Sequence, residues 1–298
     1  MRILILGKAG QVGWELQHAL ASQGDVLALG RAEADLEDPG QLRQAVIDAA
    51  PDVIVNAAAH TAVDRAESEP ERVDRINHLA VAELAAFAAG RGAWLVHYST
   101  DYVFDGSKPS PYVETDAANP ISVYGRSKLA GERAVLASGA KAVIFRTSWV
   151  HAGRGHNFIR TILRLARERE TLKVVADQIG APTSAGLVAD VTALAVHAIV
   201  DGKPPAAGIY NLTAAGETSW HGLARATIEA ALAEGALLKA TPQSIVAITT
   251  ADYPTAAARP ANSRLDTTKL RQTFRGLALP DWRVHVRGSV GALIRTGQ

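Results

Sequence analysis

Apolar runs alternate with amphipathic stretches along the first half of the chain. Each run is short and almost uninterrupted, which is typical of a strand buried on both faces of a sheet, whereas the stretches between them have helical periodicity. The predicted strands are RILILG, DVLALG, DVIVNAAA, AWLVHYST and KAVIFRTSW. The predicted helices cover residues 12–21, a stretch that begins with Asp38 as N-cap and Pro39, residues 71–89 and residues 124–136. This alternation predicts an α/β fold with a doubly wound parallel Rossmann sheet, which binds ligands at the carboxyl ends of its strands.

The pattern changes after about residue 150. Helical stretches at 157–169 and 185–200 mix with the short apolar runs LKVV, GIYNL and SIVAI, and Pro and Gly are dense in IGAPTS, DGKPP and ARPANS. We therefore predict an NAD(P)-binding domain over residues 1–150 and a smaller, irregular substrate-binding region over residues 151–298. The sequence also allows one strand or helix after residue 150 to return to the first sheet.

Composition narrows the class of protein. The 298 residues are 48% hydrophobic and 20% charged, with a formal net charge of +1, which suits a globular protein and gives no reason to expect a nucleic acid or a membrane as partner. Cysteine is absent, which excludes disulfides, thiolate metal sites and a cysteine nucleophile. Neither a secretory leader nor a long apolar run is apparent, so we expect a cytoplasmic protein.

A glycine-rich turn follows the first predicted strand. Gly7, Gly10 and Gly13 lie three residues apart in LILGKAGQVGWEL, where a strand ends and a helix begins. Glycine permits unusual dihedral angles and a close approach of the backbone to a pyrophosphate, and the N–H groups at the start of the helix bind its charge. We predict a dinucleotide site here; the alternative is a purely structural turn.

The ends of the second and third strands bear on the choice of cofactor. NAD sites commonly have an acidic residue after the second strand, but here Arg31 follows Gly30. A guanidinium pairs well with a 2′-phosphate, so the sequence favours NADPH, with NADH as an accepted alternative and a solvated Arg31 as the competing interpretation. The small residues Ala57–Ala59 let a ligand approach the third strand, and His60 lies either at its rim or on the surface.

Two motifs carry candidate catalytic residues. Tyr124 and Lys128 in VYGRSKLAGE are four residues apart, on one face of a helix. An ammonium group beside a phenol lowers its pKa from about 10 and makes it a better proton donor, although a solvated pair is the alternative. STDYVFDG, at the end of the fourth strand, offers Thr100 or the neighbouring Ser99 as a hydroxyl that orients the substrate oxygen.

With these motifs the chain resembles the extended short-chain dehydrogenases/reductases, and within them the family of dTDP-4-dehydrorhamnose reductases. The resemblance spans residues 7–270. The glycine turn and the Tyr-x-x-x-Lys pair are shared by the whole superfamily, whereas STDYVFDG, FRTSWV and RPANSRL are much more specific. Other matching segments are PDVIVNAAAHTAVDRAESEP and DQIGAPTSA.

The resemblance implies a reaction and a set of contacts. NAD(P)H would deliver hydride to the C4 ketone of a dTDP-6-deoxy-hexulose, in a pathway that makes dTDP-L-rhamnose for cell-surface polysaccharide. Tyr124 would protonate the alkoxide, Lys128 would bind the nicotinamide ribose, and Thr100 would adjust hydrogen bonding at the carbonyl. The implied cofactor contacts are Gly10, Gln11, Val12, Asp35, Leu36, Ala59, His60, Thr61, Tyr124 and Lys128, which join Gly7, Gly13 and Arg31 of the predicted dinucleotide site. The implied sugar-nucleotide contacts are Thr100, Asp101, Trp149, Arg259, Asn262 and Ser263.

Several of these contacts have a structural alternative. Trp149 would also pack well as an ordinary core residue. Arg259, Asn262 and Ser263 would also fit a structural role, in which polar side chains stabilise a turn near Pro254 and Pro260 and Arg259 lies on the surface.

Related proteins supply competing functions. Sugar-nucleotide 4,6-dehydratases have Asp-Glu after the Thr, where this chain has Asp101 and Tyr102, so a simple reductase is favoured. A 4-epimerase retains NAD, which Arg31 disfavours. Regulatory NADP-binding proteins of this fold can lose a member of the triad, whereas Thr100, Tyr124 and Lys128 are all present.

A metal site is not predicted. Relatives can carry Mg²⁺ at a subunit contact, and Glu15 would be available for it, but Gly186 stands where an acidic partner is expected and no carboxylate cluster completes a hard-cation site. A solvated Glu15 is the simpler interpretation. Monomer and homodimer both remain open.

Overall fold

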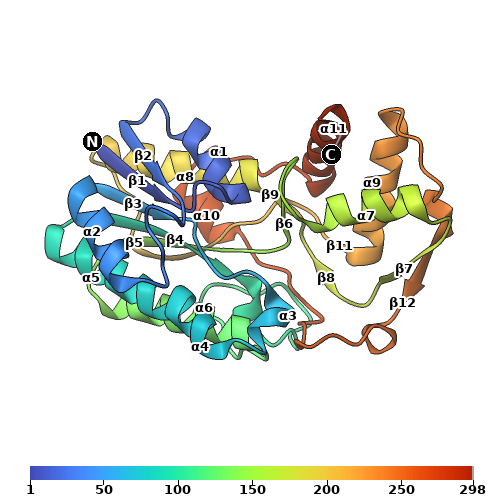
Figure 1. Cartoon of the computed structure of the whole chain (residues 1–298), viewed down its shortest axis with the longest axis horizontal. Coiled ribbons are helices and arrows are strands. Elements are labelled where there is room, and N and C mark those ends of the chain that lie inside the picture. The colour runs from blue at the N-terminus through green and yellow to red at the C-terminus, as the bar shows by residue number, and fades with distance from the viewer. Residues whose placement is uncertain (297–298) are drawn as a thin grey trace.

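Six parallel strands form the central sheet of the chain in this computed structural model, which describes residues 1–296 (Figure 1). Their order across the sheet is β10–β5–β4–β3–β1–β2. The strands are β1 (Arg2–Leu6), β2 (Asp25–Leu29), β3 (Val53–Asn56), β4 (Trp94–Thr100), β5 (Lys141–Thr147) and β10 (Gly208–Asn211). The predicted fold class is confirmed, and β10 adds a strand from beyond residue 150 to the sheet.

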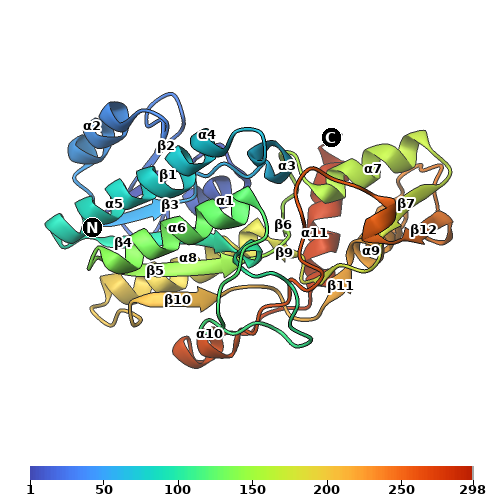
Figure 2. The ribbon, with the colours of Figure 1, turned by 90° about the horizontal axis from the view of Figure 1, so that it is seen from below.

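The strands are apolar without interruption because both faces of the sheet are covered. Ile3 and Ile5 of β1 face one core, with α1 (Gln11–Ala19) and α8 (Ala185–Val200), and Leu4 and Leu6 face the other. Helices α2 (Pro39–Ala49), α5 (Ala80–Arg91) and α6 (Val123–Ala137) cover that second face, as Figure 2 shows. Successive side chains of a strand point to opposite faces, so a two-sided burial requires apolar residues at every position.

The helix starts follow local capping rules, and one predicted helix is interrupted. Asp38 accepts hydrogen bonds from the N–H groups of Gly40 and Gln41, which confirms the predicted start of α2. The helix predicted over residues 71–89 is instead α4 (Pro70–Asp74), a π-helical turn (Arg75–Leu79) and α5. The reason lies in Asn77 of this turn, whose side chain is bonded to the backbone of His60 and holds the segment against the end of β3.

A smaller lobe is built from the C-terminal half of the chain (Figure 1). Its elements are α7 (Phe158–Glu168), β7 (Leu172–Val175), α9 (Trp220–Ala233), β12 (Ile245–Ile248) and α11 (Trp282–Arg295), and β7 and β12 pair in parallel. A separate apolar core, which includes Ile162, Leu172 and Ile228, holds this lobe together. None of the helices within residues 1–296 is long and apolar enough to cross a membrane.

The remaining elements are short. They are α3 (Val63–Ala66), a 3₁₀ turn (Asp101–Val103), β6 (Val150–His151), β8 (Ile179–Gly180), β9 (Thr183–Ser184), β11 (Thr218–Ser219), two more 3₁₀ turns (Pro242–Ser244 and Thr250–Asp252) and α10 (Thr268–Thr273). Since β2 lies on one side of β1 and β3 lies on the other, the chain changes direction at β1. A doubly wound sheet opens a ligand crevice at the carboxyl ends of the strands at such a point.

Candidate active site

The glycine turn after β1 is pressed against the end of β3. Gly7 has a φ of +88°, and a Cβ there would lie 2.8 Å from the backbone N of Ala58. A Cβ on Gly13 would lie 2.0 Å from the carbonyl oxygen of Gly7. Gly10 is the N-cap of α1, and no side chain among residues 1–296 caps this helix start. The turn therefore needs glycine for close packing, and the N–H groups of α1 are available to an anion.

A pocket of about 380 Å³ opens beside this turn. Gln11, Val12 and Gly13 belong to α1 instead of the pocket lining, and the side chain of Gln11 accepts a hydrogen bond from Asn157 (2.9 Å). Of the residues expected to bind the cofactor, the pocket lining contains Gly7, Gly10, Arg31, Asp35, Leu36, Ala59, His60 and Thr61. The structure thus brings eight of the thirteen expected residues together around one cavity, and Tyr124 and Lys128 of α6 lie outside its lining.

The far end of the pocket is strongly charged. Arg31 pairs with Asp35 (Nε to Oδ2, 3.1 Å) and with Glu37, and Arg72 of α4 pairs with the same Glu37 (Nη2 to Oε1, 2.8 Å). The guanidinium groups of Arg72 and Arg31 hold the pKa of the Glu37 carboxyl below its usual value. Neither Glu37 nor Arg72 was expected from the sequence, because their meeting depends on how α4 packs beside the loop after β2.

The candidate catalytic residues come from β4 and α6. Thr100 is the last residue of β4, and Tyr124 and Lys128 lie in α6, whose N-cap Ser122 accepts a hydrogen bond from the N–H of Gly125 (3.1 Å). The Thr100 hydroxyl lies close enough to the Tyr124 phenol to lower its pKa, and it donates a hydrogen bond to Oδ1 of Asp101 (3.0 Å). The Oγ of Ser99 is buried and has no hydrogen-bond partner among the described residues. The geometry therefore brings Thr100, and not Ser99, to Tyr124.

Burial controls the ionisation of this pair. It raises the pKa of Tyr124, against a lowering effect of the hydrogen bond with Thr100, and it lowers the pKa of Lys128 to about 8, against the charge of Glu132. The expectation that the Lys128 ammonium lowers the pKa of Tyr124 is wrong for this structure. The physical reason is that desolvation dominates at Tyr124, while the Nζ of Lys128 lies 3.3 Å from Nε2 of His97.

His97 is a polar residue that the sequence pattern did not single out. It is fully buried in β4, and its Nδ1 lies 3.4 Å from Nδ2 of Asn56 at the end of β3. The Oδ1 of Asn56 accepts a hydrogen bond from the N–H of Ala58 (3.2 Å), which ties this chain of contacts to the cofactor pocket. Desolvation and the charge of Lys128 hold the pKa of His97 well below its usual value, so the ring is neutral. The sequence feature that could have identified His97 is its position as a polar residue inside an otherwise apolar strand.

A buried ion pair stands one helical turn beyond Lys128. Glu132 binds Arg146 of β5 through two hydrogen bonds of 2.8 and 2.6 Å, and both side chains are almost completely buried. Such a pair is costly to break, because either charge would be left in an apolar environment. It fixes α6 against β5 at the level of the candidate catalytic residues.

Two expected substrate residues meet beside Thr100. Asp101 is buried at the start of the 3₁₀ turn after β4, and its Oδ1 accepts a hydrogen bond from Thr100 (3.0 Å). Burial raises the pKa of Asp101 to about 6, and the nearby side chains of Ser263 and Thr100 oppose this shift, while its Oδ2 is buried without a hydrogen-bond partner among the described residues. Ser263 comes from the loop before α10, so this contact joins segments that lie far apart in the sequence.

Trp149 has a strained backbone and a stacked ring. Its φ is +48°, a left-handed conformation that a large side chain rarely adopts. The indole stacks on Trp220 of α9 with ring centroids 3.7 Å apart, and a Cβ on Gly180 would lie 2.7 Å from it. Strain of this kind clusters at functional sites and argues against an ordinary core residue. Trp220 was not expected, because its partner comes from a distant element.

The remaining two expected residues are bound to other loops. Arg259 pairs with Asp64 of α3 (Nη2 to Oδ2, 2.7 Å). Asn262 donates from Nδ2 to the carbonyl oxygens of Lys108 (2.6 Å) and Ser110 (2.9 Å), and its Oδ1 accepts from the N–H of Arg264. These contacts favour the alternative that Asn262 stabilises a turn. A role in substrate binding stays a prediction for both Arg259 and Asn262.

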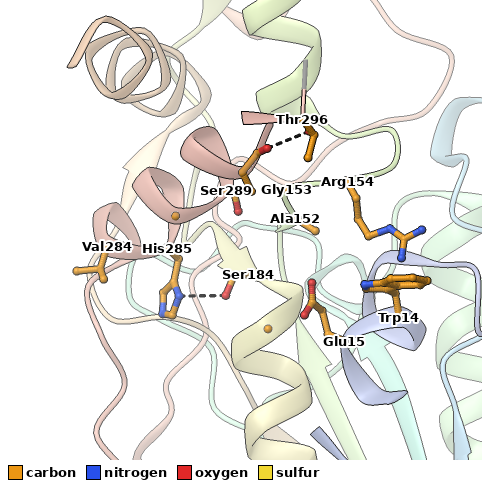
Figure 3. Close-up of a pocket in the computed structure, with 13 residues that line it drawn as sticks. Trp14, Glu15, Ala152, Gly153, Arg154, Ser184, Val284, His285, Ser289 and Thr296 are labelled. Atoms are coloured by element: carbon orange, nitrogen blue, oxygen red, sulfur yellow. Dashed lines mark hydrogen bonds between the residues drawn. The ribbon is translucent and has the colours of Figure 1, made fainter. Parts of the chain in front are cut away.

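A larger cavity, of about 590 Å³, lies between α1 and α11 (Figure 3). Glu15 and Gly186 both line it, and the guanidinium of Arg154 lies 3.6 Å above the ring of Trp14. Within residues 1–296, no group of three or more His, Asp or Glu side chains is placed to hold a metal ion. Glu15 is the one carboxylate among the described residues that line this cavity, and the guanidinium of Arg154 brings a positive charge to the same lining. This combination does not fit a hard-cation site, so we derive no role for Mg²⁺. None of the expected catalytic residues lines this cavity.

Comparisons with known proteins agree with this geometry. The family model for the RmlD substrate binding domain matches residues 1–294. A protein from Shigella flexneri named dTDP-4-dehydrorhamnose reductase is 50% identical over 300 residues, which cover 99% of each chain. The crystal structure of a dTDP-4-dehydrorhamnose reductase from Bacillus anthracis in complex with NADP has a TM-score of 0.85 at 32% identity and covers 96% of each chain. The Clostridium acetobutylicum structure of the same name has a TM-score of 0.87 at 33% identity and covers 100% of each chain.

Proposed function

Because the chain belongs to the RmlD substrate-binding-domain family, we propose that it catalyses the dTDP-4-dehydrorhamnose reductase reaction. It is an NAD(P)H-dependent oxidoreductase, and the family resemblance of its motifs is confirmed. Its substrate would be dTDP-4-dehydro-β-L-rhamnose and its product dTDP-β-L-rhamnose, which feeds cell-surface polysaccharide. The observation that carries the proposal is the meeting of Thr100, Tyr124 and Lys128 at the strand ends that also hold the glycine turn.

The pocket fits a dinucleotide. The uncapped start of α1 suits a pyrophosphate, so we assign Gly10, Gln11 and Val12 to it, and Arg31 suits a 2′-phosphate. We assign Asp35 and Leu36 to the adenine end and the segment from Ala59 to Thr61 to the ribose and its neighbours. NADPH, when bound, supplies the hydride for the C4 ketone. The Bacillus anthracis relative was crystallised with NADP, which supports this choice.

The proton comes from Tyr124 in this proposal. The phenol is protonated at neutral pH, which is the form that a proton donor requires, and burial, which raises its pKa, makes it a weaker acid in this structure. Thr100, beside Tyr124, would orient the carbonyl oxygen toward the phenol. Lys128 would bind ribose hydroxyls, with His97 beside its ammonium group.

The sugar nucleotide would lie between the two lobes. Asp101 and Ser263 would contact the sugar and diphosphate, Trp149 would stack on the sugar, and Arg259 and Asn262 would complete the diphosphate contacts. We therefore propose that residues 1–150, joined by α8 and β10, bind the cofactor, and that most of residues 151–298 bind the sugar nucleotide.

The test is NADPH oxidation with dTDP-4-dehydro-β-L-rhamnose, comparing the native chain with Tyr124→Phe. We expect turnover by the native chain and a loss of about a thousandfold or more in the variant, with NADPH binding retained. Tight NADPH binding without turnover by the native chain would contradict the proposal and favour a regulatory protein of this fold or another sugar-nucleotide substrate.

A further inference from the structure

One carboxylate binds two arginines at the adenine-ribose end of the cofactor pocket. Glu37 lies in the loop between β2 and α2, and it lines the pocket together with Arg31, Arg65 and Arg72. Its Oε1 contacts the guanidinium groups of both Arg31 and Arg72, and its Oε2 accepts a second hydrogen bond from Nε of Arg72 (3.0 Å). The carboxylate of Glu37 thus neutralises part of the positive charge that Arg31 and Arg72 bring to this end of the pocket.

The two arginines are held to different degrees. Arg72 is bound by Glu37 on one side and by Glu69 on the other (Nη1 to Oε2, 3.1 Å). Arg31 reaches the pocket from the end of β2, and 64% of its side chain is exposed. Arg31 can therefore exchange partners with little cost in packing, whereas Arg72 is fixed by two carboxylates.

A carboxylate and a phosphate compete for the same guanidinium. Both offer paired oxygens to the planar fork of arginine, and the phosphate carries more charge. A 2′-phosphate bound by Arg31 would meet Glu37 on the same group, and the two negative charges would repel each other. The ribose of NADH carries a hydroxyl at this position, which has no charge to repel and can donate a hydrogen bond to a carboxylate.

Asp35, which also pairs with Arg31, is less free to respond. Asp35 accepts a hydrogen bond from the N–H of Glu37 (2.9 Å) at Oδ1, and its own N–H donates to Gln41 (2.7 Å). These contacts fix Asp35 within the loop. Glu37, whose side chain is bound only to arginines among the described residues, is the group whose removal changes the charge without breaking the loop.

We propose that Glu37 is a specificity-determining residue that competes with the 2′-phosphate for Arg31, and so weakens the preference for NADPH over NADH. The inference rests on the proposed function only in that it requires the pocket to bind a dinucleotide. It predicts that removing the carboxylate strengthens NADPH binding, and that NADH binding stays the same or weakens, so selectivity for NADPH increases.

The experiment measures dissociation constants for NADPH and NADH in the absence of any sugar nucleotide, by quenching of protein fluorescence. In Glu37→Gln we expect the ratio of the NADH constant to the NADPH constant to rise about threefold to tenfold over the native chain. Glu71→Gln is the matched control, because Glu71 is an exposed carboxylate on the same helix as Arg72 and lies outside the pocket lining. That variant should change the ratio by less than about twofold.

A double substitution tests whether Glu37 acts through Arg31. In an Arg31→Ala background, Glu37→Gln should lose most of its effect on the ratio. An unchanged or lowered ratio in Glu37→Gln, or an equal rise in Glu71→Gln, overturns the inference. If the native chain binds both dinucleotides but reduces no sugar nucleotide, the proposed substrate is wrong. The inference about Glu37 is then still decided by the ratio of the two dissociation constants. Failure to bind either dinucleotide contradicts both.

Discussion

The two sides of the proposed site are held together in different ways. The cofactor side, with Gly7, Gly13 and Ala58, depends on backbone atoms of neighbouring strand ends that touch one another. The substrate side depends on side chains from distant segments, such as Asp101 with Ser263 and Trp149 with Trp220. The first kind of site follows from local sequence and strand order, whereas the second follows from the packing of one lobe on the other.

The largest expected effect is on the cofactor side. Gly13→Ala would place a Cβ 2.0 Å from the carbonyl oxygen of Gly7, so α1 and the glycine turn must move apart. We expect a loss of about 3 kcal/mol in the free energy of unfolding and of measurable NADPH binding, from urea denaturation and a binding titration. Gly90→Ala is the control, because its Cβ would meet no atom within 4 Å and the substitution sits in α5. If Gly13→Ala binds NADPH as the native chain does, the backbone account of this side is wrong.

This contrast explains what the sequence could predict. The five strands of the first half, the start of α2 and the glycine turn follow from local patterns, and the structure contains all of them. The meeting of Glu37 with Arg72, and of His97 with Lys128, depends on which distant segments pack together. For the same reason the ionisation of Tyr124 was mispredicted, since spacing along a helix says nothing about burial.

The next effect is on the substrate side and depends on pH. Burial raises the pKa of Asp101 from 3.8 to about 6, so the folded state holds this proton more tightly than the unfolded state. The contribution of Asp101 to stability is therefore highest below about pH 4 and falls as the pH rises through about 6. Asp101→Asn has no such proton to release, so its free energy of unfolding should gain about 2 to 3 kcal/mol relative to the native chain between about pH 4 and pH 7. A difference that does not vary with pH in urea denaturation would contradict this account of Asp101.

A smaller effect separates substrate binding from cofactor binding. Trp149→Ala removes the ring that stacks on Trp220 and should raise KM for the sugar nucleotide about tenfold, with the NADPH dissociation constant unchanged. Trp14→Ala removes an exposed indole from the cavity between α1 and α11 and serves as the control in the same steady-state assay. An equal rise in KM for both variants would show that Trp149 has no specific part in substrate binding.

The smallest effect concerns the loop that carries Arg259. Arg259→Ala should raise KM for the sugar nucleotide by about threefold, because the guanidinium is already paired with Asp64, whose side chain is 48% exposed, and such a pair contributes little. Asp64→Asn removes the partner of Arg259 but leaves the guanidinium free to bind a diphosphate. Its KM should therefore stay the same or fall. A rise of the same size in both variants would mean that the ion pair only holds the loop in place.

The most direct measurement of the central claim follows the hydride itself. The native chain would be supplied with dTDP-4-dehydro-β-L-rhamnose and NADPH that carries deuterium at the transferable position of the nicotinamide, and the product would be examined by NMR. The account predicts dTDP-β-L-rhamnose with deuterium at C4, and almost no product from Tyr124→Phe despite retained NADPH binding. Deuterium at another carbon, no reduced product from the native chain, or undiminished product from Tyr124→Phe would contradict it.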